Sequence, residues 1–247
     1  MQAVIYIAHG TRVQEGIEEA KAFVERAKKH IAIPLQEICF LELVKPSIEQ
    51  TIEYCINKGA TQIALIPILL LTANHAKKDI PEIVKPLQIK YPHIVFSYGK
   101  PFGIHHKLIV QIYERIEEQT TEITSDAEIL LIGRGSSDPS VVRDFLEIAT
   151  RFKLRYGFRH VNIAFLYGNG PSFSNVVEKM TNSPDKPLFI VPYLLFQGLL
   201  RKHIEKELEG IEVVTVCNSL GYGDLVLDVL VERTREAIKG LHTSCAS

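Results

Sequence analysis

The sequence contains no tryptophan, only two methionines and only four cysteines, and it carries no excess of either charge. Its formal net charge is −1, so no global field attracts nucleic acid or an anionic membrane, and we expect neither as a partner. The cysteines are far apart and form no CxxC pair: Cys39, Cys55, Cys217 and Cys245. This usage argues against a disulfide framework or a structural zinc site and favours a reducing, cytoplasmic location.

The sequence also lacks a long hydrophobic run. The longest apolar segment, residues 63–73, is interrupted by Pro67 and is too short to span a bilayer. Residues 1–10 contain no basic segment and no cleavage site of small residues, so we expect no secretory signal. Hydrophobic residues make up 46% of the 247 residues and charged residues 23%, as in an ordinary globular protein of one large or two moderate domains.

Short β-branched runs alternate with longer charged segments of helical period. Strands are predicted near 2–8, 34–42, 61–68, 94–98, 127–132, 160–166, 187–192 and 211–216. Helices are predicted near 14–30, 45–58, 74–90, 104–119, 138–153, 171–182, 198–209 and 224–240. This alternation predicts right-handed βαβ units and parallel strands, either in open sheets or in a closed (β/α)8 barrel.

An internal repeat favours the open sheets. A shift of 125 residues places IAHGTR (7–12) on IGRGSS (132–137), FLELVKPSI (40–48) on FLYGNGPSF (165–173), and IPILL (66–70) on VPYLL (191–195). In the last predicted helix of each half the shift shortens to 118, which aligns YERIEE (113–118) with VERTRE (231–236). A repeat of this length indicates a duplicated domain. We therefore predict an α/β protein of two open, four-stranded parallel sheets flanked by helices, with domains at 1–122 and 123–247.

Three polar residues follow three consecutive predicted strands. His9 follows the first, Glu42 ends the second, and His75 follows the third. Ligands bind at the carboxyl edge of open α/β sheets, where these residues are expected to meet. Two imidazoles and a carboxylate form a set suited to a divalent ion such as Fe, Co, Ni or Zn, with open coordination positions.

The second half of the repeat provides a comparison for these three residues. At the equivalent positions it has Arg134, Tyr167 and Leu200, whereas Gly10 and Pro67 keep their counterparts. The candidate ligands are therefore lost together while residues of the scaffold persist. We expect the metal site in the first domain and no such ligands in the second.

Simpler interpretations stay open from the residues alone. A histidine at a strand end is more often a hydrogen-bonded turn residue than a metal ligand, and Glu42 can project into solvent. Pro46 and Ser47 are most simply explained as a helix start, as are His105 and His106. Only the joint pattern of three ligands at one sheet edge supports a metal site.

Four motifs together resemble the sirohydrochlorin chelatases of the class II chelatase family, which insert cobalt or iron into a tetrapyrrole. They are AHGTR (8–12), FLELVKPSI (40–48), IPILLLTANHAKKDIPE (66–82) and IGRGSSDP (132–139). The resemblance covers nearly the whole chain and implies the fused, long form of the family, with two flavodoxin-like domains. Thr11 stands where serine is common, and its hydroxyl is retained.

The resemblance implies the function and the site. His9 and His75 would bind the metal and take the pyrrole protons, and Glu42 falls at an acidic position of the family. The expected partners are sirohydrochlorin, an acidic tetrapyrrole, and a divalent metal ion as substrate: Fe²⁺ or Co²⁺, with Ni²⁺ as a further candidate. No permanently bound cofactor is expected, and the fused chain is expected to be a monomer.

The acidic substrate predicts cations near the strand ends, and its flat ring predicts an apolar turn against it. The residues expected to bind it are Arg12, Lys45, Leu70, Leu71, Thr72, Ala73, Asn74 and Arg134. Two other functions remain as alternatives. A carrier of the metal or the tetrapyrrole could use the same ligands without catalysis. A histidine phosphatase would use His9 as phosphoryl acceptor, but such enzymes have arginine before the histidine, where this chain has Ala8.

Overall fold

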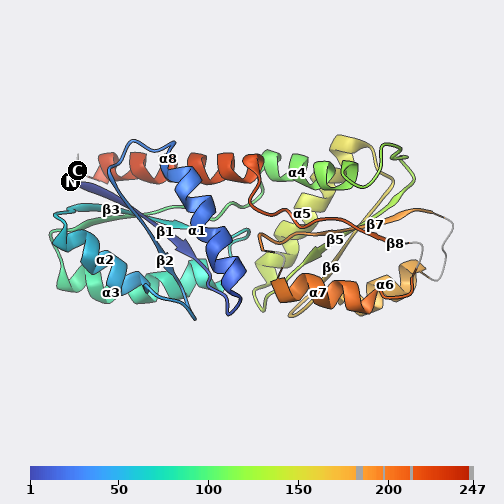
Figure 1. The fold of residues 1–247 in the computed structure, drawn as a ribbon, viewed down its shortest axis with the longest axis horizontal. Coiled ribbons are helices and arrows are strands. Elements are labelled where there is room, and N and C mark those ends of the chain that lie inside the picture. The colour runs from blue at the N-terminus through green and yellow to red at the C-terminus, as the bar shows by residue number, and fades with distance from the viewer. Residues whose placement is uncertain (182–185, 197, 212–213, 245–247) are drawn as a thin grey trace. The chain divides into compact units, whose positions relative to one another are not determined.

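The computed structural model describes residues 1–181, 186–196, 198–211 and 214–244, in which strands and helices alternate (Figure 1). The first half contains β1 (Gln2–Ala8), α1 (Gln14–Lys28), β2 (Leu35–Phe40), α2 (Ile48–Asn57), β3 (Gln62–Pro67), the π-helix η1 (His75–Asp79), α3 (Ile80–Lys90), β4 (Val95–Tyr98) and α4 (His106–Glu117). The second half contains β5 (Glu128–Gly133), α5 (Pro139–Tyr156), β6 (His160–Phe165), α6 (Phe173–Thr181), β7 (Leu188–Pro192), α7 (Gly198–Glu207), β8 (Val214–Val216) and α8 (Asp224–Ser244).

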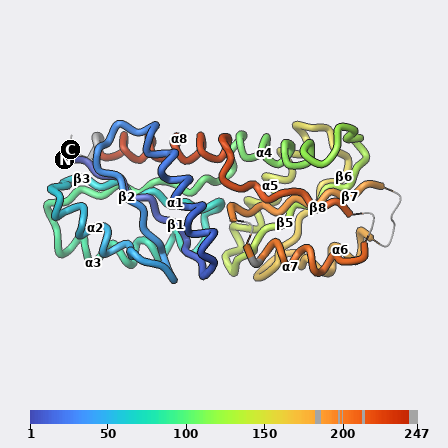
Figure 2. The backbone as a smooth tube through the Cα atoms, viewed as in Figure 1, coloured from blue at the N-terminus to red at the C-terminus, as the bar shows by residue number. Residues whose placement is uncertain are grey.

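Each half forms one open sheet of four parallel strands. The order is β2-β1-β3-β4 in the first sheet and β6-β5-β7-β8 in the second. Figure 2 follows the backbone as it passes from strand to helix and back within each sheet. The predicted fold class, two flavodoxin-like domains with open parallel sheets flanked by helices, is confirmed. The barrel alternative is wrong, because each sheet ends in edge strands.

Alternate residues of β1 pack toward opposite faces of the first sheet. Ala3, Ile5 and Ile7 belong to a buried cluster that includes residues of α2 and α3. Tyr6 points to the other face, where its hydroxyl donates a hydrogen bond of 3.0 Å to Gln36 Oε1 and also interacts with Thr234 of α8. Burial raises the pKa of Tyr6 to about 12. In Figure 1, α1 and α8 cover one face of this sheet, and α2 and α3 cover the other. Both faces are therefore buried, as expected for parallel strands.

The last helix of each half packs with the sheet of the other half. The chain divides into a first unit, Met1–Gly103 with Leu227–Ser247, and a second unit, Ile104–Val226. Helix α4 thus belongs to the second unit, although it follows the first sheet in sequence, and most of α8 belongs to the first. The predicted boundary between residues 122 and 123 separates the two sheets, but it does not separate the two compact units.

Two equivalent arginines show this exchange. The shift of 118 that aligns the end of each half pairs Arg115 with Arg233 and Phe102 with Leu220. Within the first unit, Arg233 Nη2 donates a hydrogen bond of 2.8 Å to the Phe102 carbonyl. Within the second unit, Arg115 Nη2 donates one of 2.7 Å to the Leu220 carbonyl. The same contact is therefore built twice, each time from one helix and the loop of the other half.

Two predicted element bounds near the site change in the structure. Strand β2 ends at Phe40, so that Glu42 lies in the turn beyond the strand and not at its end. Helix α2 begins at Ile48, later than predicted, because Ser47 is its N-cap and forms a capping box with Gln50. The interpretation of Pro46 and Ser47 as a helix start is confirmed.

The remaining differences concern the two helix starts after β3 and β4 and the last strand. The predicted helix 74–90 begins with the π-helix η1 before α3. His105 is the N-cap of α4, and its side chain accepts a hydrogen bond from the Lys107 backbone, which confirms that helix start. Residues 212–213 of the predicted strand, residue 182 of the predicted helix and Cys245 lie outside the described residues. None of the helices in the described ranges has the length and apolar character needed to span a bilayer.

Candidate metal centre

A close backbone contact joins the loops that follow β1 and β2. Gly10 has φ +96°, and a Cβ built on it would lie 2.0 Å from the carbonyl oxygen of Glu42, so a side chain cannot fit there. Next to this contact, the backbone NH of Leu41 donates to Ala8 O at 2.8 Å, and that of Glu42 donates to His9 O at 3.1 Å. The two loops are thus held together at the carboxyl edge of the sheet, where parallel strands β1 and β2 end.

This contact places His9 beside Glu42. His9 Nδ1 lies 3.4 Å from Glu42 Oε1 and 3.3 Å from the carbonyl oxygen of Gly10. The side chain of His9 is 27% exposed and that of Glu42 49% exposed. A half-buried imidazole therefore lies at the sheet edge with oxygen acceptors on its Nδ1 side.

His75 reaches the same edge from the start of η1, beyond β3. Its ring lies 4.7 Å from that of His9, centroid to centroid, in an edge-to-face arrangement at 85°. His75 Nδ1 also lies 2.6 Å from Asp79 Oδ2, one turn further along η1. The structure thus brings together all three residues that the sequence predicted as metal ligands and adds a second carboxylate.

These side chains form contacting pairs and not a closed metal cage. Within the residues that the structure describes, no group of three or more His, Cys, Asp or Glu side chains is placed to hold a metal ion as it stands. Each carboxylate instead faces an imidazole: Glu42 faces His9, and Asp79 faces His75. Nε2 of each ring is therefore the candidate ligand atom, and Glu42 must turn away from His9 Nδ1 to bind the same ion.

The second unit repeats the loop contact without the candidate ligands. Gly135 has φ +93°, and a Cβ on it would lie 1.7 Å from the carbonyl oxygen of Tyr167. The backbone NH of Tyr167 donates to Arg134 O at 3.0 Å, as that of Glu42 donates to His9 O in the first unit. The same loop geometry therefore presents an exposed arginine and an exposed tyrosine in place of histidine and glutamate.

The described cysteines are not candidate ligands. Cys39, Cys55 and Cys217 are buried and unbridged. Burial raises the pKa of both Cys55 and Cys217 to about 12, and it also raises that of Cys39. Because the thiolate is the form that binds metals, these thiols are inert at neutral pH.

The residues predicted to bind substrate occupy loops at the carboxyl edges of the sheets. Arg12 and Lys45 are exposed and follow β1 and β2, and Arg134 is exposed and follows β5. The turn 70–74 is half-buried and leads into η1, where Ala73 O accepts from the backbone NH of Lys77. The first unit therefore presents two cations and a partly apolar turn near the imidazole pair.

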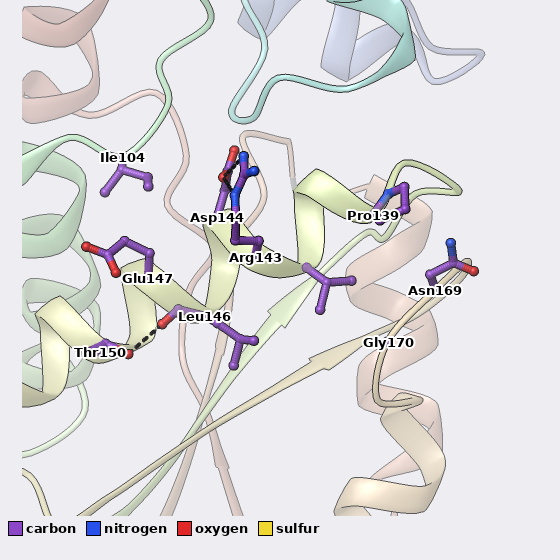
Figure 3. A pocket seen from close by; sticks show the side chains of 10 residues that line it. Ile104, Pro139, Arg143, Asp144, Leu146, Glu147, Thr150, Asn169 and Gly170 are labelled. Atoms are coloured by element: carbon purple, nitrogen blue, oxygen red, sulfur yellow. Dashed lines mark hydrogen bonds and ion pairs between the residues drawn. The ribbon is translucent and has the colours of Figure 1, made fainter.

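Two hollows of the structure are lined by other residues. A hollow of about 820 Å³ runs along one face of α5 and reaches Asn169 and Gly170 (Figure 3). Its charged side chains include Arg143 and Asp144, which pair with each other at 2.8 Å, and among its described lining residues there is no histidine or cysteine. A smaller one, of about 410 Å³, borders η1 at Ala76. Neither hollow contains the imidazole pair.

Comparison with known proteins identifies the family of the chain. The profile of the CbiX family matches residues 3–119 and, a second time, residues 128–237, which together cover both repeats. The chain belongs to the CbiX family. The predicted resemblance to sirohydrochlorin chelatases in their long, duplicated form is confirmed by the relatives of this CbiX chain.

The CbiX chain is 42% identical over 239 residues to the sirohydrochlorin ferrochelatase of Priestia megaterium, with 95% of this chain and 90% of the relative covered. It is 32% identical over 251 residues to the sirohydrochlorin cobaltochelatase of the same organism, with 97% and 81% covered. Among solved structures, SirB from Bacillus subtilis with Fe³⁺ superposes with a TM-score of 0.89 at 40% identity, covering 96% of this chain and 95% of that one.

One polar residue of the site was missed in the sequence. Asp79 follows Lys77 and Lys78, and such a run of charges usually marks a solvated helix face. The available signal was its spacing of four residues from His75, which places two side chains on the same face of a helix. The structure shows that this face carries the contact between the two side chains.

Leu43 is a second feature that sequence reasoning missed. It has φ +65° beside Glu42, and its side chain is 59% exposed. A leucine in this left-handed conformation costs roughly 1–2 kcal/mol relative to a relaxed backbone, and such strain concentrates at functional sites. The repeat contained a signal, because the counterpart of Leu43 is Gly168, with φ +76°.

The contact between Gly10 and Glu42 leads to a stability prediction. Gly10→Ala should lower the free energy of unfolding by about 3 kcal/mol or more, because a methyl group cannot lie 2.0 Å from a carbonyl oxygen without displacing a loop. Gly59→Ala is the matched control: Gly59 has φ +92°, but a Cβ there meets nothing within 4 Å. It should cost only the strain of the left-handed backbone conformation, about 1–2 kcal/mol. Urea denaturation of the two variants measures the difference, and equal costs would contradict the close contact.

Proposed function

We propose that this chain inserts a divalent metal ion, Fe²⁺ or Co²⁺, into sirohydrochlorin. The observation that carries the proposal is the pair of imidazoles, His9 and His75, whose ring centroids lie 4.7 Å apart at the carboxyl edge of the first sheet. Support comes from the relatives, which include a sirohydrochlorin ferrochelatase and a sirohydrochlorin cobaltochelatase. Under this proposal the metal ion is a substrate and not a resident cofactor.

Metal insertion requires two chemical tasks that neutral imidazoles perform. The two pyrrole N–H protons of the ring must be removed, and the metal must exchange its protein ligands for four ring nitrogens. An imidazole has an ordinary pKa of about 6.5 and can accept a proton near neutral pH. It also holds a borderline metal ion less firmly than a thiolate site does. We assign both tasks to His9 and His75, with Glu42 as the acidic third member of the metal-binding set.

Substrate binding is assigned to residues of the loops at the carboxyl edges of the two sheets. The apolar part of the turn 70–74 is half-buried and can lie against a flat ring, while Thr72 and Asn74 supply polar groups. Arg12 and Lys45 in the first unit and Arg134 in the second supply charges that complement the carboxylates of an acidic tetrapyrrole. We further propose a monomer in a reducing cytoplasm, because one chain contains both repeats and its described cysteines are unbridged thiols.

Turnover distinguishes this proposal from the carrier alternative. The protein is incubated with sirohydrochlorin and Co²⁺ or Fe²⁺, and the absorption spectrum of the ring is followed at substoichiometric protein. A chelatase converts many equivalents of the ring, whereas a carrier alters at most one equivalent. The phosphatase alternative is set aside, because the relatives of this chain are chelatases.

The imidazole pair leads to a prediction for activity. His9→Ala and His75→Ala should each lower kcat/KM for metal insertion roughly a hundredfold or more, since each removes a metal ligand or proton acceptor. Glu42→Gln should have a smaller effect, because it removes the charge but keeps an oxygen. Thermal unfolding should change little, because both histidines lie on partly exposed turns.

His93→Ala is the matched control for these variants. His93 is an exposed histidine of the first unit that packs against Tyr91, away from the imidazole pair. Its removal should leave kcat/KM near that of the original chain. Near-normal turnover by either His9→Ala or His75→Ala would show that the assigned roles are wrong.

The assigned cations lead to a prediction for salt dependence. Exposed charge pairs are each worth about 1 kcal/mol or less and are screened by salt, but several acting on one polyanion add up. KM for sirohydrochlorin should therefore rise with ionic strength, while kcat changes less. Arg12→Gln, Lys45→Gln and Arg134→Gln should each raise KM and flatten this dependence, without changing the apparent affinity for the metal.

Lys29→Gln is the control for the cation variants. Lys29 is an exposed lysine at the carboxyl end of α1, which lies at the opposite edge of the sheet from the imidazole pair. Its KM and salt dependence should match those of the original chain. If KM is indifferent to salt and to all three substitutions, the ring is held by its apolar face and these cations are not its binding residues.

A further inference from the structure

Asp79 forms a short polar contact with His75. Its Oδ2 lies 2.6 Å from His75 Nδ1, across the π-helix η1. The side chain of His75 is 33% exposed and that of Asp79 42% exposed, so the pair lies between solvent and protein. The ring of His75 thus contacts both the carboxylate of Asp79 and the ring of His9.

An ionised carboxylate only accepts hydrogen bonds, so the partner nitrogen must donate. His75 Nδ1 therefore carries the proton when the ring is neutral, and Nε2 carries the lone pair. A lone pair is what a metal ion or a pyrrole proton needs from an imidazole. Metal-binding histidines in proteins commonly donate their other ring N–H to a carboxylate, which fixes the tautomer and the orientation of the ring.

The internal repeat shows that the carboxylate accompanies the histidine. The shift of 125 pairs His75 with Leu200 and Asp79 with Ile204. Ile204 is completely buried and belongs to the hydrophobic core of the second sheet. The corresponding segment there is the α-helix α7, whereas His75 and Asp79 are the first and last residues of a π-helix. The half without the histidine has thus also lost the carboxylate and the π-helical turn.

We propose that Asp79 is a positioning residue that holds His75 in the Nδ1–H tautomer, with Nε2 directed away from Asp79 and available to the metal. The inference rests on the proposed function, because it assumes that His75 binds the metal. In this role Asp79 itself does not bind the metal or the tetrapyrrole. Its loss leaves the imidazole in place but lets the ring rotate and exchange tautomers.

The direct test is nuclear magnetic resonance of the metal-free protein with ¹⁵N-labelled histidine. Long-range ¹H–¹⁵N spectra at about pH 8.5, above the ordinary histidine pKa of about 6.5, distinguish a protonated from an unprotonated ring nitrogen, and His75→Ala assigns the signals. In the original chain, His75 should show a protonated Nδ1 and an unprotonated Nε2. The opposite pattern would overturn the proposal without any variant of Asp79.

Variants of Asp79 then measure what the contact does. Asp79→Asn should convert the His75 signals to those of a tautomer mixture and raise the Kd for Co²⁺ about 10–100-fold, while Asp79→Glu should restore the Nδ1–H pattern and most of the affinity. Glu25→Gln is the matched control, because Glu25 makes an equally short contact of 2.6 Å, to Lys28 on α1. A Kd within about twofold of the original in Asp79→Asn, with the tautomer unchanged, would overturn the proposal.

The same experiments separate this proposal from the proposed function. Tautomer and Co²⁺ affinity are measured without sirohydrochlorin, so they test Asp79 even if the original chain shows no turnover. Absence of turnover by the original chain with intact Co²⁺ binding would overturn the proposed function alone. If turnover is present, Asp79→Asn should raise KM for Co²⁺ and leave KM for sirohydrochlorin unchanged, a split that a merely structural role does not produce.

Discussion

The site depends on one backbone contact, the approach of Gly10 to the carbonyl oxygen of Glu42. A Cβ at Gly10 would lie only 2.0 Å from that oxygen, so the loops after β1 and β2 can meet only with glycine at this position. The meeting brings His9 beside Glu42 and places both at the sheet edge that His75 reaches from η1. The second unit keeps the same contact, between Gly135 and Tyr167, and presents different side chains on it. The contact between glycine and carbonyl is therefore part of the scaffold, and the chemistry depends on the side chains that the two loops carry.

Duplication explains how one half lost these side chains while both kept their shape. Each compact unit includes the last helix of the other half of the sequence. Arg233 in the first unit and Arg115 in the second each donate a hydrogen bond to a backbone carbonyl of that unit. Neither half can then change its last helix without affecting the other sheet, which constrains the scaffold. The ligand positions carry no such constraint: Arg134, Tyr167 and Leu200 replace the candidate ligands, and buried Ile204 replaces Asp79.

Most of the fold and the proximity of the three candidate ligands could be predicted from the sequence. The hydrophobic periodicity and the alternation of strand and helix patterns located the strands. Because neighbouring parallel strands share a carboxyl edge, the positions of His9, Glu42 and His75 after three strands predicted that they lie close together. The exchange of α4 and α8 could not be predicted, because an apolar helix face has the same pattern whichever sheet it covers. Asp79 was missed because a charged residue beside two lysines has the pattern of a solvated helix. The turn of Glu42 toward His9 Nδ1 depends on side-chain packing, which periodicity does not encode.

The central claim is that the metal-transfer chemistry is confined to the first unit, at His9 and His75. The most direct test is the position of the metal in crystals of the full chain soaked with Co²⁺, located by anomalous scattering at the cobalt absorption edge. The account predicts cobalt within coordination distance of Nε2 of both imidazoles, about 2.0–2.1 Å by analogy with zinc–histidine bonds. Cobalt bound in the second unit beside Arg134, with none at His9 and His75, would contradict it.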